Sequence, residues 1–439
     1  MTETAFEPLP AVEPAEPQAA VGTLVMKFGG TSVADPEKIR RVAARLVEAS
    51  RAGTRVVGVV SAMGHHTDEL VALAHEVSPR PKPRELDMLI SVGERISCAL
   101  VAMAISDLGR EAISLTGSQA GIVTDTVHGK AKIVEVKAHR IHNALDEDRI
   151  VLVAGFQGVS TAYDITTLGR GGSDTTAVAI AAALGAEVCE IYTDVAGVFS
   201  ADPRIVPEAR KLSVVTFEEM LEMAASGAGV LQLRSVEYAR THGVRIHCRA
   251  SYSDEAGTFV VGEEETMEHP LITAVTHSTE EARVTLLGVP DRPGVAGRIF
   301  GALADAHVLV DMIVQNEPVS EGAEADISFT VPRADVRAAH AVLDPMVGDM
   351  VKAVAADPEM GIVSIIGAGM KSHPGVAAKV FSTLGDEMIN IEMISTSPIK
   401  ISCVIAGSAV PGAVRALHAA FELSGEGTIR AERPFGEFV

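Results

Sequence analysis

Two glycine-rich segments carry the residues best suited to chemistry. The first is Lys27-Phe28-Gly29-Gly30-Thr31-Ser32, directly after an apolar run. Paired glycines let the backbone approach an anion closely, and successive N–H groups can form an anion-binding nest beside the Lys27 ammonium. The spacing differs from a Walker A loop, in which Lys-Ser/Thr follows the glycines. The segment therefore predicts a phosphate site, with a simple turn as the alternative.

The second glycine-rich segment places an arginine where a turn alone would not need one. It reads Thr167-Leu168-Gly169-Arg170-Gly171-Gly172-Ser173-Asp174-Thr175-Thr176 and leads into an Ala-rich stretch that we expect to be helical. Ser173 or Asp174 is suited to cap that helix, so capping plus a tight turn is one interpretation. Capping does not explain Arg170, whereas a bidentate clamp on a substrate carboxylate does.

A third group of polar residues follows another apolar run. Thr193-Asp194 ends this run, with Phe199 and Asp202-Pro203-Arg204 beyond it. An aromatic ring and an arginine after a strand suit the base and the phosphates of a nucleotide. An Asp–Arg pair that only holds the loop is equally compatible with this sequence.

A fourth group suits a small amino acid. Ser61 ends a further apolar run, and Thr67 and Glu94 follow it. Glu94 would pair with an α-ammonium; taken alone, Thr67 and Glu94 would more often be a helix cap and a solvated charge. The adjacent pair His65-His66 lacks the i, i+4 spacing of a helical metal site, so we expect no metal ligation there.

These segments need a sheet to bring them together. From residue 23 to 252 apolar runs alternate with amphipathic stretches, such as a strand at 23–28 and helical spacing at 37–51. This alternation predicts an α/β domain with a parallel or mixed sheet covered on both faces. A polar, acidic linker is expected at 253–276. Residues 1–22 are acidic and proline-rich without a basic residue, which predicts a disordered tail.

The second half contains an internal repeat. An apolar strand, a Pro-Gly pair, a helix and an acidic-Met-Ile segment occur at 284–313 and again at 363–394. Each unit reads β-α-β-β-α-β, and we expect the units to occupy 277–357 and 358–439. Each Pro-Gly turn opens a helix N-terminus whose free N–H groups suit a ligand's carboxylate. Modules that only dimerise are the alternative.

Composition narrows the classes of partner. The formal net charge is −21, which disfavours nucleic acid and anionic membranes, and the absence of Trp argues against stacking on bases. No apolar run approaches the length that crosses a bilayer, and the acidic start is not a secretory signal. The four cysteines are far apart, which predicts reduced thiols in a cytoplasmic protein. They are Cys98, Cys189, Cys248 and Cys403.

Together these motifs resemble the aspartate kinase family over about residues 23–425. The Lys-Phe-Gly-Gly-Thr-Ser opening, the glycine-rich segment at 166–176 and Asp202-Pro203-Arg204 match its three signatures in order. Residues 367–376, Gly-Ala-Gly-Met-Lys-Ser-His-Pro-Gly-Val, resemble the second ACT module of the lysine- and threonine-regulated bacterial type. The resemblance implies an amino-acid-kinase-like α/β sandwich followed by two ferredoxin-like ACT modules.

The resemblance also implies roles for individual residues. Catalysis would use Lys27, Arg170 and Asp174, the last organising the phosphate and metal region. The substrate would contact Ser61, Thr67, Glu94, Arg170 and Ser173. ATP would contact Lys27, Phe28, Gly29, Gly30, Thr193, Asp194, Phe199 and Arg204. Lysine or threonine would contact Asp291, Gly294, Gln315, Asn316, Val376, Asn390 and Ile391.

The implied reaction is phosphoryl transfer from ATP, with Mg²⁺, to the side-chain carboxylate of L-aspartate. The product, 4-phospho-L-aspartate, would enter lysine, threonine and methionine biosynthesis. Lysine and/or threonine would inhibit through the ACT modules, which would also join chains into a homo-oligomer. An internal start near Met267 would yield a shorter subunit.

The sequence departs from the family pattern in several places. Relatives usually carry a Lys that helps hold ATP where Gly229 stands, so a contact of about 1.5–3 kcal/mol is expected to be missing. The other departures are His66, Tyr163, Phe199 and Ala377. They keep two alternatives open: a kinase for another carboxylic amino acid in a specialised pathway, and a catalytically weak homologue that senses amino acids.

Overall fold

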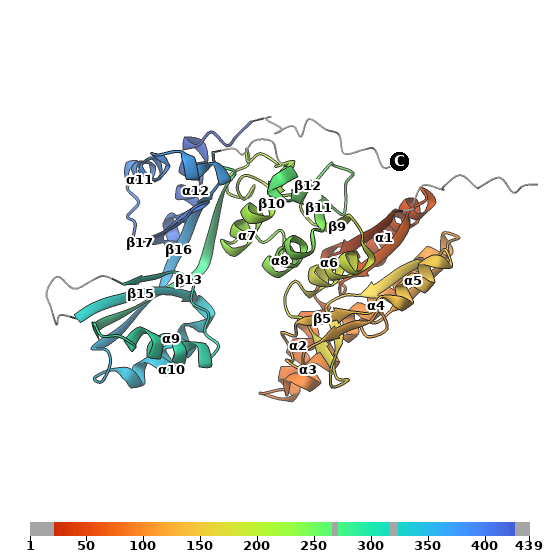
Figure 1. The fold of residues 1–439 in the computed structure, drawn as a ribbon, viewed down its shortest axis with the longest axis horizontal. Helices are drawn as coiled ribbons and strands as arrows, with labels where there is room; N and C mark the ends of the chain where they lie inside the picture. Colours follow the sequence, from red (N-terminus) through yellow and green to blue (C-terminus); the bar gives the residue numbers. More distant parts are fainter. Residues whose placement is uncertain (1–21, 266–270, 316–323, 426–439) are drawn as a thin grey trace, which may run out of the picture.

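Three β-sheets organise the chain in the computed structural model, which describes residues 22–265, 271–315 and 324–425 (Figure 1). An eight-stranded and a four-stranded sheet form the N-terminal half, and a six-stranded sheet forms the C-terminal half. The predicted α/β class is confirmed. Asn316 and Met267, together with most of the acidic tail, lie outside the described residues.

The eight-stranded sheet is built around β1 and has the order β10-β12-β11-β9-β1-β2-β6-β3. All neighbours are parallel except β11 and β12. The carboxyl ends of the central strands therefore meet at one edge. The strands are β1 Thr23–Phe28, β2 Arg55–Val60, β3 Ala112–Leu115, β6 Ile150–Ala154, β9 Val188–Thr193, β10 Val214–Thr216, β11 Arg245–Ala250 and β12 Thr258–Val261.

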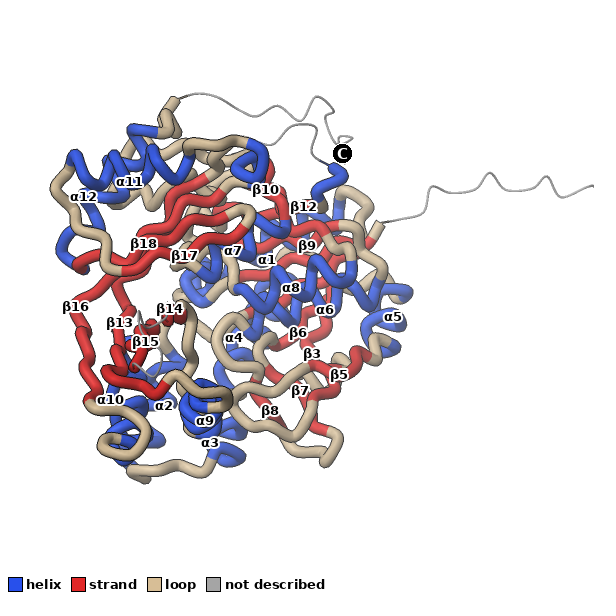
Figure 2. Tube along the Cα trace, turned by 60° about the vertical axis from the view of Figure 1, so that its left-hand side comes forward, coloured by secondary structure: helices blue, strands red, loops and turns tan. Residues whose placement is uncertain are grey.

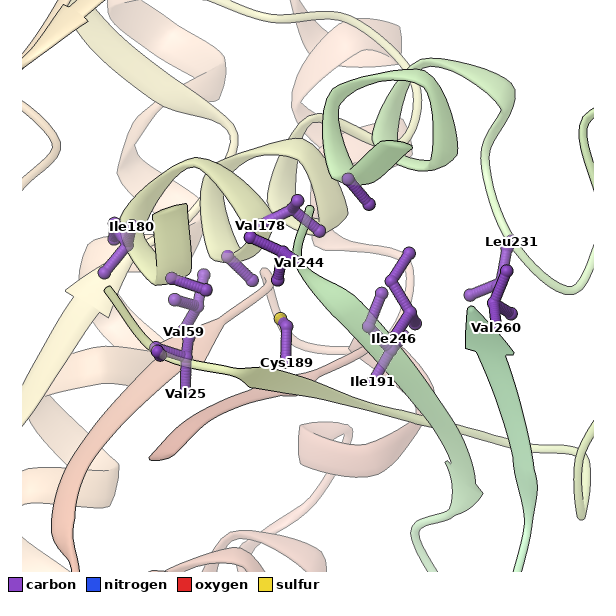
Figure 3. Packing of buried hydrophobic residues seen from close by; sticks show 14 of the residues in the cluster. Val25, Val59, Val178, Ile180, Cys189, Ile191, Leu231, Val244, Ile246 and Val260 are labelled. Atoms are coloured by element: carbon purple, nitrogen blue, oxygen red, sulfur yellow. The ribbon is translucent and has the colours of Figure 1, made fainter. Parts of the chain in front are cut away.

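Helices cover both faces of this sheet, because successive strand residues point to opposite sides. Val25 packs into the core beneath α6, while its neighbour Met26 packs into the core shared by α1 and α4. Figure 3 shows Val25, Cys189 and other strand residues against α6. One face carries α1 Pro36–Arg51 and α4 Val92–Asp107. The other carries α5 His139–Asp146, α6 Gly172–Leu184, α7 Phe217–Ala225 and α8 Leu233–His242.

Helix α6 is deeply buried against the eight-stranded sheet. Every residue from Gly172 to Ala181 is buried, and most of them are small, so the helix can approach the sheet closely. Gly171 before the helix and Gly185 after it both adopt left-handed conformations, with φ of 68° and 63°. The helix therefore begins abruptly, with its free N–H groups at the edge where β1 ends.

The four-stranded sheet has the order β5-β4-β7-β8 and delivers the second glycine-rich segment to the same edge. Its strands are β4 Ile122–Thr124, β5 Ile133–Val136, β7 Gln157–Ser160 and β8 Ile165–Thr167. Two short helices, α2 His66–Val77 and α3 Pro83–Ile90, lie near it. Arg170 lies three residues after the end of β8.

Residues Pro83–Asp107 require a correction to the sequence-based expectation. This stretch of 25 residues, α3 plus α4, is long and apolar enough to cross a membrane by length and composition, whereas no such run was expected. It contains buried Asp87 and Glu94, and 44% of its most apolar window is buried inside the fold. Ile90, Cys98, Val101 and Ile105 lie in the core, whereas Met88, Val92, Ile96, Leu100 and Met103 are exposed.

The six-stranded sheet is antiparallel throughout, with the order β14-β15-β13-β16-β18-β17. Helices α9 Val295–Asp305 and α10 Val336–Leu343 cover one half, and α11 Val376–Asp386 and α12 Val410–Ala420 cover the other. The strands are β13 Ala274–Pro290, β14 Ile313–Gln315, β15 Glu324–Pro332, β16 Ala353–Ile366, β17 Met393–Ser397 and β18 Lys400–Ala406.

Two long strands run through both halves of this sheet (Figure 2). Residues 281–290 of β13 pair with β15 in the first half, whereas residues 274–278 pair with β16 in the second. The fourth strand of the second module is therefore formed by residues that precede the first module in the sequence. The expected contiguous modules therefore need correction, since their boundaries at 277 and 358 fall inside β13 and β16. A local repeat pattern cannot reveal a strand that comes from a distant part of the sequence.

The expected linker at 253–276 also differs from the structure. Strand β12 lies within it and pairs with β10 and β11, so the eight-stranded sheet continues past residue 252. Thr258 is buried and its hydroxyl donates to the Leu212 carbonyl at 2.5 Å. The acidic residues around it made this short apolar strand easy to miss.

Candidate active site

A cavity of about 1420 Å³ opens at the carboxyl edge of the eight-stranded sheet. Residues from all four groups identified in the sequence line this cavity. The first and last of them, Lys27 and Thr193, are more than 160 residues apart along the chain. The predicted residues that line this main cavity are Lys27, Gly30, Ser61, Thr67, Glu94, Arg170, Ser173, Asp174 and Thr193. The convergence of residues 27–30 with residues 170–174 is the arrangement that a phosphoryl-transfer site requires.

Lys27 and Asp174 form an ion pair at the centre of this cavity. Lys27 is the penultimate residue of β1 and Asp174 lies in the first turn of α6; Nζ and Oδ1 are 2.5 Å apart. Both side chains are almost buried, and the approach gives an ion pair rather than a well-oriented hydrogen bond. The helix N-terminus adds a favourable field for anions at the same place.

Arg170 projects from a turn that only glycine can form. Gly169 and Gly171 have φ of 78° and 68°, and a Cβ on Gly171 would lie 2.1 Å from Gln232 Cγ. Among the described residues no carboxylate pairs with the exposed Arg170 guanidinium, although it lines the main cavity. It is therefore available for a ligand's carboxylate.

Glu94 offers an unpaired carboxylate oxygen to the same cavity. The residue is 3% exposed; Oε1 accepts from the Ala62 amide at 3.2 Å, whereas Oε2 has no partner among the described residues. Burial raises the pKa of Glu94 to about 7, with the Ala62 amide and Arg95 acting in the opposite direction. A ligand ammonium would satisfy Oε2 and favour the ionised form.

Backbone contacts fix the strand ends around these charges. The Ser61 amide donates to the Phe28 carbonyl at 3.1 Å, and the Ser61 carbonyl accepts from the Ser97 hydroxyl at 2.6 Å. These bonds leave the Ser61 side chain to line the main cavity. A Cβ on Gly155 would lie 2.6 Å from Ser173 Oγ, so a glycine is needed where β6 ends beside α6.

A second cavity of about 470 Å³ adjoins the first. The two share Thr193, Gly229 and Val230 as lining residues. Asp194, Phe199 and Arg204, all predicted to hold a nucleotide, line the second cavity.

The arginine of the second cavity has a partner of its own. Arg204 makes a bidentate pair with Asp202, with Nη2–Oδ2 at 2.7 Å, and this guanidinium holds the pKa of Asp202 below its usual value. Arg204 is 89% exposed at its side chain, so the Asp–Arg pair holds the loop and also presents the cation at the surface. Both sequence interpretations of this motif are thus compatible with the geometry.

The side chain of Phe28 is placed differently from the expectation that it contacts ATP. It is 1% exposed and stacks on Tyr192, with ring centroids 4.8 Å apart and planes 9° apart. It belongs to the core under α1 and α4 and lines neither cavity. Successive residues of a strand point to opposite faces of the sheet. Because Lys27 faces the cavity, the ring of the next residue, Phe28, points to the opposite face.

Several lining residues were not predicted from the sequence. Phe156 lines the main cavity with φ of 68°, a strained conformation for an aromatic residue. His277 of β13 lines the second cavity, and Asp87 and His128 line the first. Residues at the end of α9 also reach the main cavity: Ala304, His307, Val308 and Leu309. No spacing rule identifies these residues, because each approaches only through tertiary packing.

Comparison with known proteins agrees with this geometry. The profile of the amino acid kinase family matches residues 22–250, and that of the ACT domain matches residues 284–345 and 363–421. The aspartokinase of Mycobacterium tuberculosis is 57% identical over 407 residues, covering 92% of this chain and 97% of its own. That of Corynebacterium glutamicum is 53% identical with the same coverage. This chain belongs to the aspartokinase family.

Solved aspartokinase structures share the whole architecture. Escherichia coli aspartokinase III in its R-state complex with aspartate and ADP superposes with a TM-score of 0.78 at 26% identity, over 91% of this chain and 99% of that one. Its T-state complex with lysine and aspartate gives 0.72 over the same shares.

Some of the residues that depart from the family pattern line the cavities, and others lie away from them. Gly229 lines both cavities and Phe199 lines the second. His66 and Tyr163 line neither, and Tyr163 is 91% exposed in a surface turn. Ala377 packs against the core of the second ACT module. Only Gly229 and Phe199 therefore bear on the two cavities directly.

The predicted effector residues fall at equivalent places in the two modules. Asp291 and Gly294 precede α9, and Gln315 ends β14. Val376 opens α11, and Asn390 and Ile391 precede β17. Gly294 and Gly375 have φ of 91° and 100°, so both helices open from left-handed glycines as the Pro-Gly turns predicted. This set remains a prediction, and Asn316 lies outside the described residues.

The raised pKa of Glu94 predicts a pH-dependent stability. A carboxyl with a raised pKa favours the fold in its protonated form, so this contribution is present below about pH 4.5 and is lost as the pH rises through about 7. We expect Glu94→Gln to raise the free energy of unfolding at pH 8 by up to about 3 kcal/mol, and far less at pH 5. Chemical denaturation at both pH values measures this.

The exposed Glu76→Gln on α2 is the matched control and should show no such difference. Equal effects of Glu94→Gln at the two pH values would contradict the assignment. The same substitution should weaken aspartate binding, because the amide cannot pair with an ammonium.

Proposed function

We propose that this chain is an active aspartate kinase, which transfers the γ-phosphoryl group of ATP to the side-chain carboxylate of L-aspartate. The observation that carries this proposal is the meeting of four charged side chains at one cavity: the Lys27–Asp174 pair, the free Arg170 and Glu94 with its unpaired oxygen. That set matches the charges of a dicarboxylic amino acid beside a phosphate chain. Family membership agrees with this reading.

The amino acid would bind with its ammonium at Glu94 and its α-carboxylate at Arg170. Ser61, Thr67 and Ser173 line the same cavity and supply hydroxyl groups for the remaining polar atoms. The nucleotide would occupy the second cavity, with Phe199 and Arg204 along its walls. Its phosphates would pass the junction at Thr193 and Gly229 to reach Lys27.

The chemical step joins two anions, so positioning and charge neutralisation are the main tasks of the protein. The β-carboxylate of aspartate attacks the γ-phosphorus in line, the bond to the β,γ-bridging oxygen breaks, and ADP leaves with the electron pair. Lys27 and the N–H groups that open α6 stabilise the charge that develops on the transferred group. No covalent intermediate on the protein is required.

Magnesium fits this site through the nucleotide rather than through a protein cage. Among the described residues no group of three or more His, Cys, Asp or Glu side chains is arranged to hold a metal. Mg²⁺ commonly uses one or two carboxylates with phosphate oxygens and water, and Asp174 is the carboxylate beside the expected phosphates. When bound, the ion would neutralise phosphate charge during transfer.

Regulation and assembly are proposed to use the six-stranded sheet. Its edge strands β14 and β17 expose Ile313 and Ile394, at 52% and 43%. Exposed apolar edge strands favour pairing with another chain. We infer a homo-oligomer in which lysine and/or threonine bind near Gly294 and Gly375, with a shorter subunit from Met267 as a second product. The product 4-phospho-L-aspartate would serve lysine, threonine and methionine synthesis in the cytoplasm.

One observation favours a second candidate function. Gly229 provides no cation at the junction of the cavities, and a Cβ there would meet nothing within 4 Å. A catalytically weak homologue that senses amino acids through its ACT modules would show this feature. The remaining alternative is a kinase for another carboxylic amino acid. His66 does not line the main cavity, so its position does not support this alternative.

The proposed activity is tested by trapping the acyl phosphate with hydroxylamine in the presence of ATP, Mg²⁺ and L-aspartate. We expect an aspartate-dependent signal that falls at least about 100-fold in Lys27→Ala, because a charge that stabilises the transition state is lost. Lys38→Ala, on a half-buried lysine of α1 that lines neither cavity, is the control for loss of a lysine from the same region. A signal only with another carboxylic acid, or none at all, would replace the proposal with one of its alternatives.

The open space at Gly229 predicts a gain of ATP affinity. We expect Gly229→Lys to lower the KM for ATP by about 10- to 100-fold, since a charge-assisted contact contributes about 1.5–3 kcal/mol. Gly229→Gln adds similar length without charge and should have little effect. Equal changes in both variants, or none in either, would show that the junction does not contact phosphate.

Effector binding is expected to appear in both stability and activity. Lysine and threonine, each at about one hundred times its dissociation constant, should each stabilise the fold by about 2.7 kcal/mol and should inhibit the reaction. Thermal unfolding and the hydroxylamine assay measure the two effects on one preparation. Asp291→Asn should weaken both together; an unchanged melting temperature with unchanged rate would reject regulation by these ligands.

A further inference from the structure

A buried carboxylate on α3 organises one wall of the main cavity. Asp87 is 1% exposed and accepts four hydrogen bonds. Its Oδ1 accepts from the Thr167 hydroxyl at 2.6 Å and from the Gly129 amide at 3.1 Å. Its Oδ2 accepts from His128 Nδ1 at 2.8 Å and from the same amide at 3.1 Å. One side chain thus ties α3, the turn at 127–130 and the end of β8 together.

This network determines how the His128 ring is presented. An ionised Asp87 can only accept, so Nδ1 carries a proton and Nε2 is the nitrogen left for other partners. Among the described residues Nε2 has no hydrogen-bonding partner, and the side chain is 19% exposed where it lines the main cavity. A histidine anchored in this way offers a fixed ring to a ligand.

The same turn lies against the arginine-bearing segment. A Cβ on Gly169 would lie 3.1 Å from the Gly129 carbonyl oxygen, so residues 128–129 and 169–170 are in close contact. Thr167, three residues before Arg170, is also bonded to Asp87. His128 and Arg170 therefore lie on neighbouring segments of one wall, both facing the main cavity.

We propose that His128 is a further substrate-binding residue, whose Nε2–H donates to the α-carboxylate of the amino acid beside Arg170. Asp87 acts as its positioning residue: it accepts the hydrogen bond from Nδ1–H, so that Nε2 faces the cavity and can donate to the carboxylate when both ring nitrogens carry a proton. This inference rests on the proposed function, since it assigns a second contact to the same substrate. It also explains why a charged side chain is buried in the otherwise apolar inner face of α3.

Steady-state kinetics on the full chain test the assignment. We expect His128→Ala to raise the KM for L-aspartate by about 10- to 100-fold, the effect of losing one hydrogen bond between charged groups. The KM for ATP and the kcat should stay unchanged. Asp87→Asn should act in the same direction, and the double variant should be no worse than His128→Ala, because Asp87 acts through the ring.

The contact with the α-carboxylate has its own measurement. L-Aspartate α-amide lacks that charge, so its inhibition constant should change far less in His128→Ala than the KM for aspartate does. Equal losses for both compounds would overturn the assignment. His142→Ala, on the exposed face of α5, is the matched control and should leave every constant unchanged.

Kinase activity and the role of His128 are distinguished by separate results. If the unsubstituted chain forms no acyl phosphate from aspartate, the proposed function fails. If it is active and His128→Ala behaves like His142→Ala, only this inference fails. A fall in kcat together with a rise in both KM values would show a structural role for the Asp87–His128 pair and would also overturn it.

Discussion

The ion pair between Lys27 and Asp174 is the interaction on which the site depends. It joins the end of β1 to the first turn of α6, and both partners are less than a tenth exposed. Burying two charges is costly, and removal of one partner of such a pair costs about 3–5 kcal/mol because the other is left uncompensated. The parallel register of β1 with β2 and β9 holds the remaining strand ends around this pair. One fixed cation and a helix N-terminus face the cavity here, where the phosphate chain is proposed to bind.

Much of the site could be predicted because its residues follow strands in glycine-rich turns. Lys27, Arg170, Ser173 and Asp174 are found this way, since parallel strands bring their carboxyl ends to one edge. Phe28 shows the limit of the same argument: it sits inside the motif, yet strand alternation turns its ring into the core. Phe156, His277 and the end of α9 reach the cavities through tertiary packing, which leaves no local mark in the sequence.

The fold of the C-terminal half was predictable in its parts but not in its connections. The Pro-Gly turns and the two helices of each module follow from local patterns. The sharing of β13 and β16 does not, because strand pairing is decided by partners far apart in the chain. The two halves are also joined by buried polar contacts. Glu219 of α7 accepts from the Thr273 hydroxyl and from the Ala368 amide.

The order of strands in that sheet restricts where the chain can be divided. Residues 274–278 complete the second module although they precede the first, so a fragment beginning after β13 would lack an inner strand and expose the apolar side of β16. Met267 stands seven residues ahead of Ala274. A polypeptide that starts there keeps all six strands, and it would carry a complete regulatory sheet without any part of the catalytic domain.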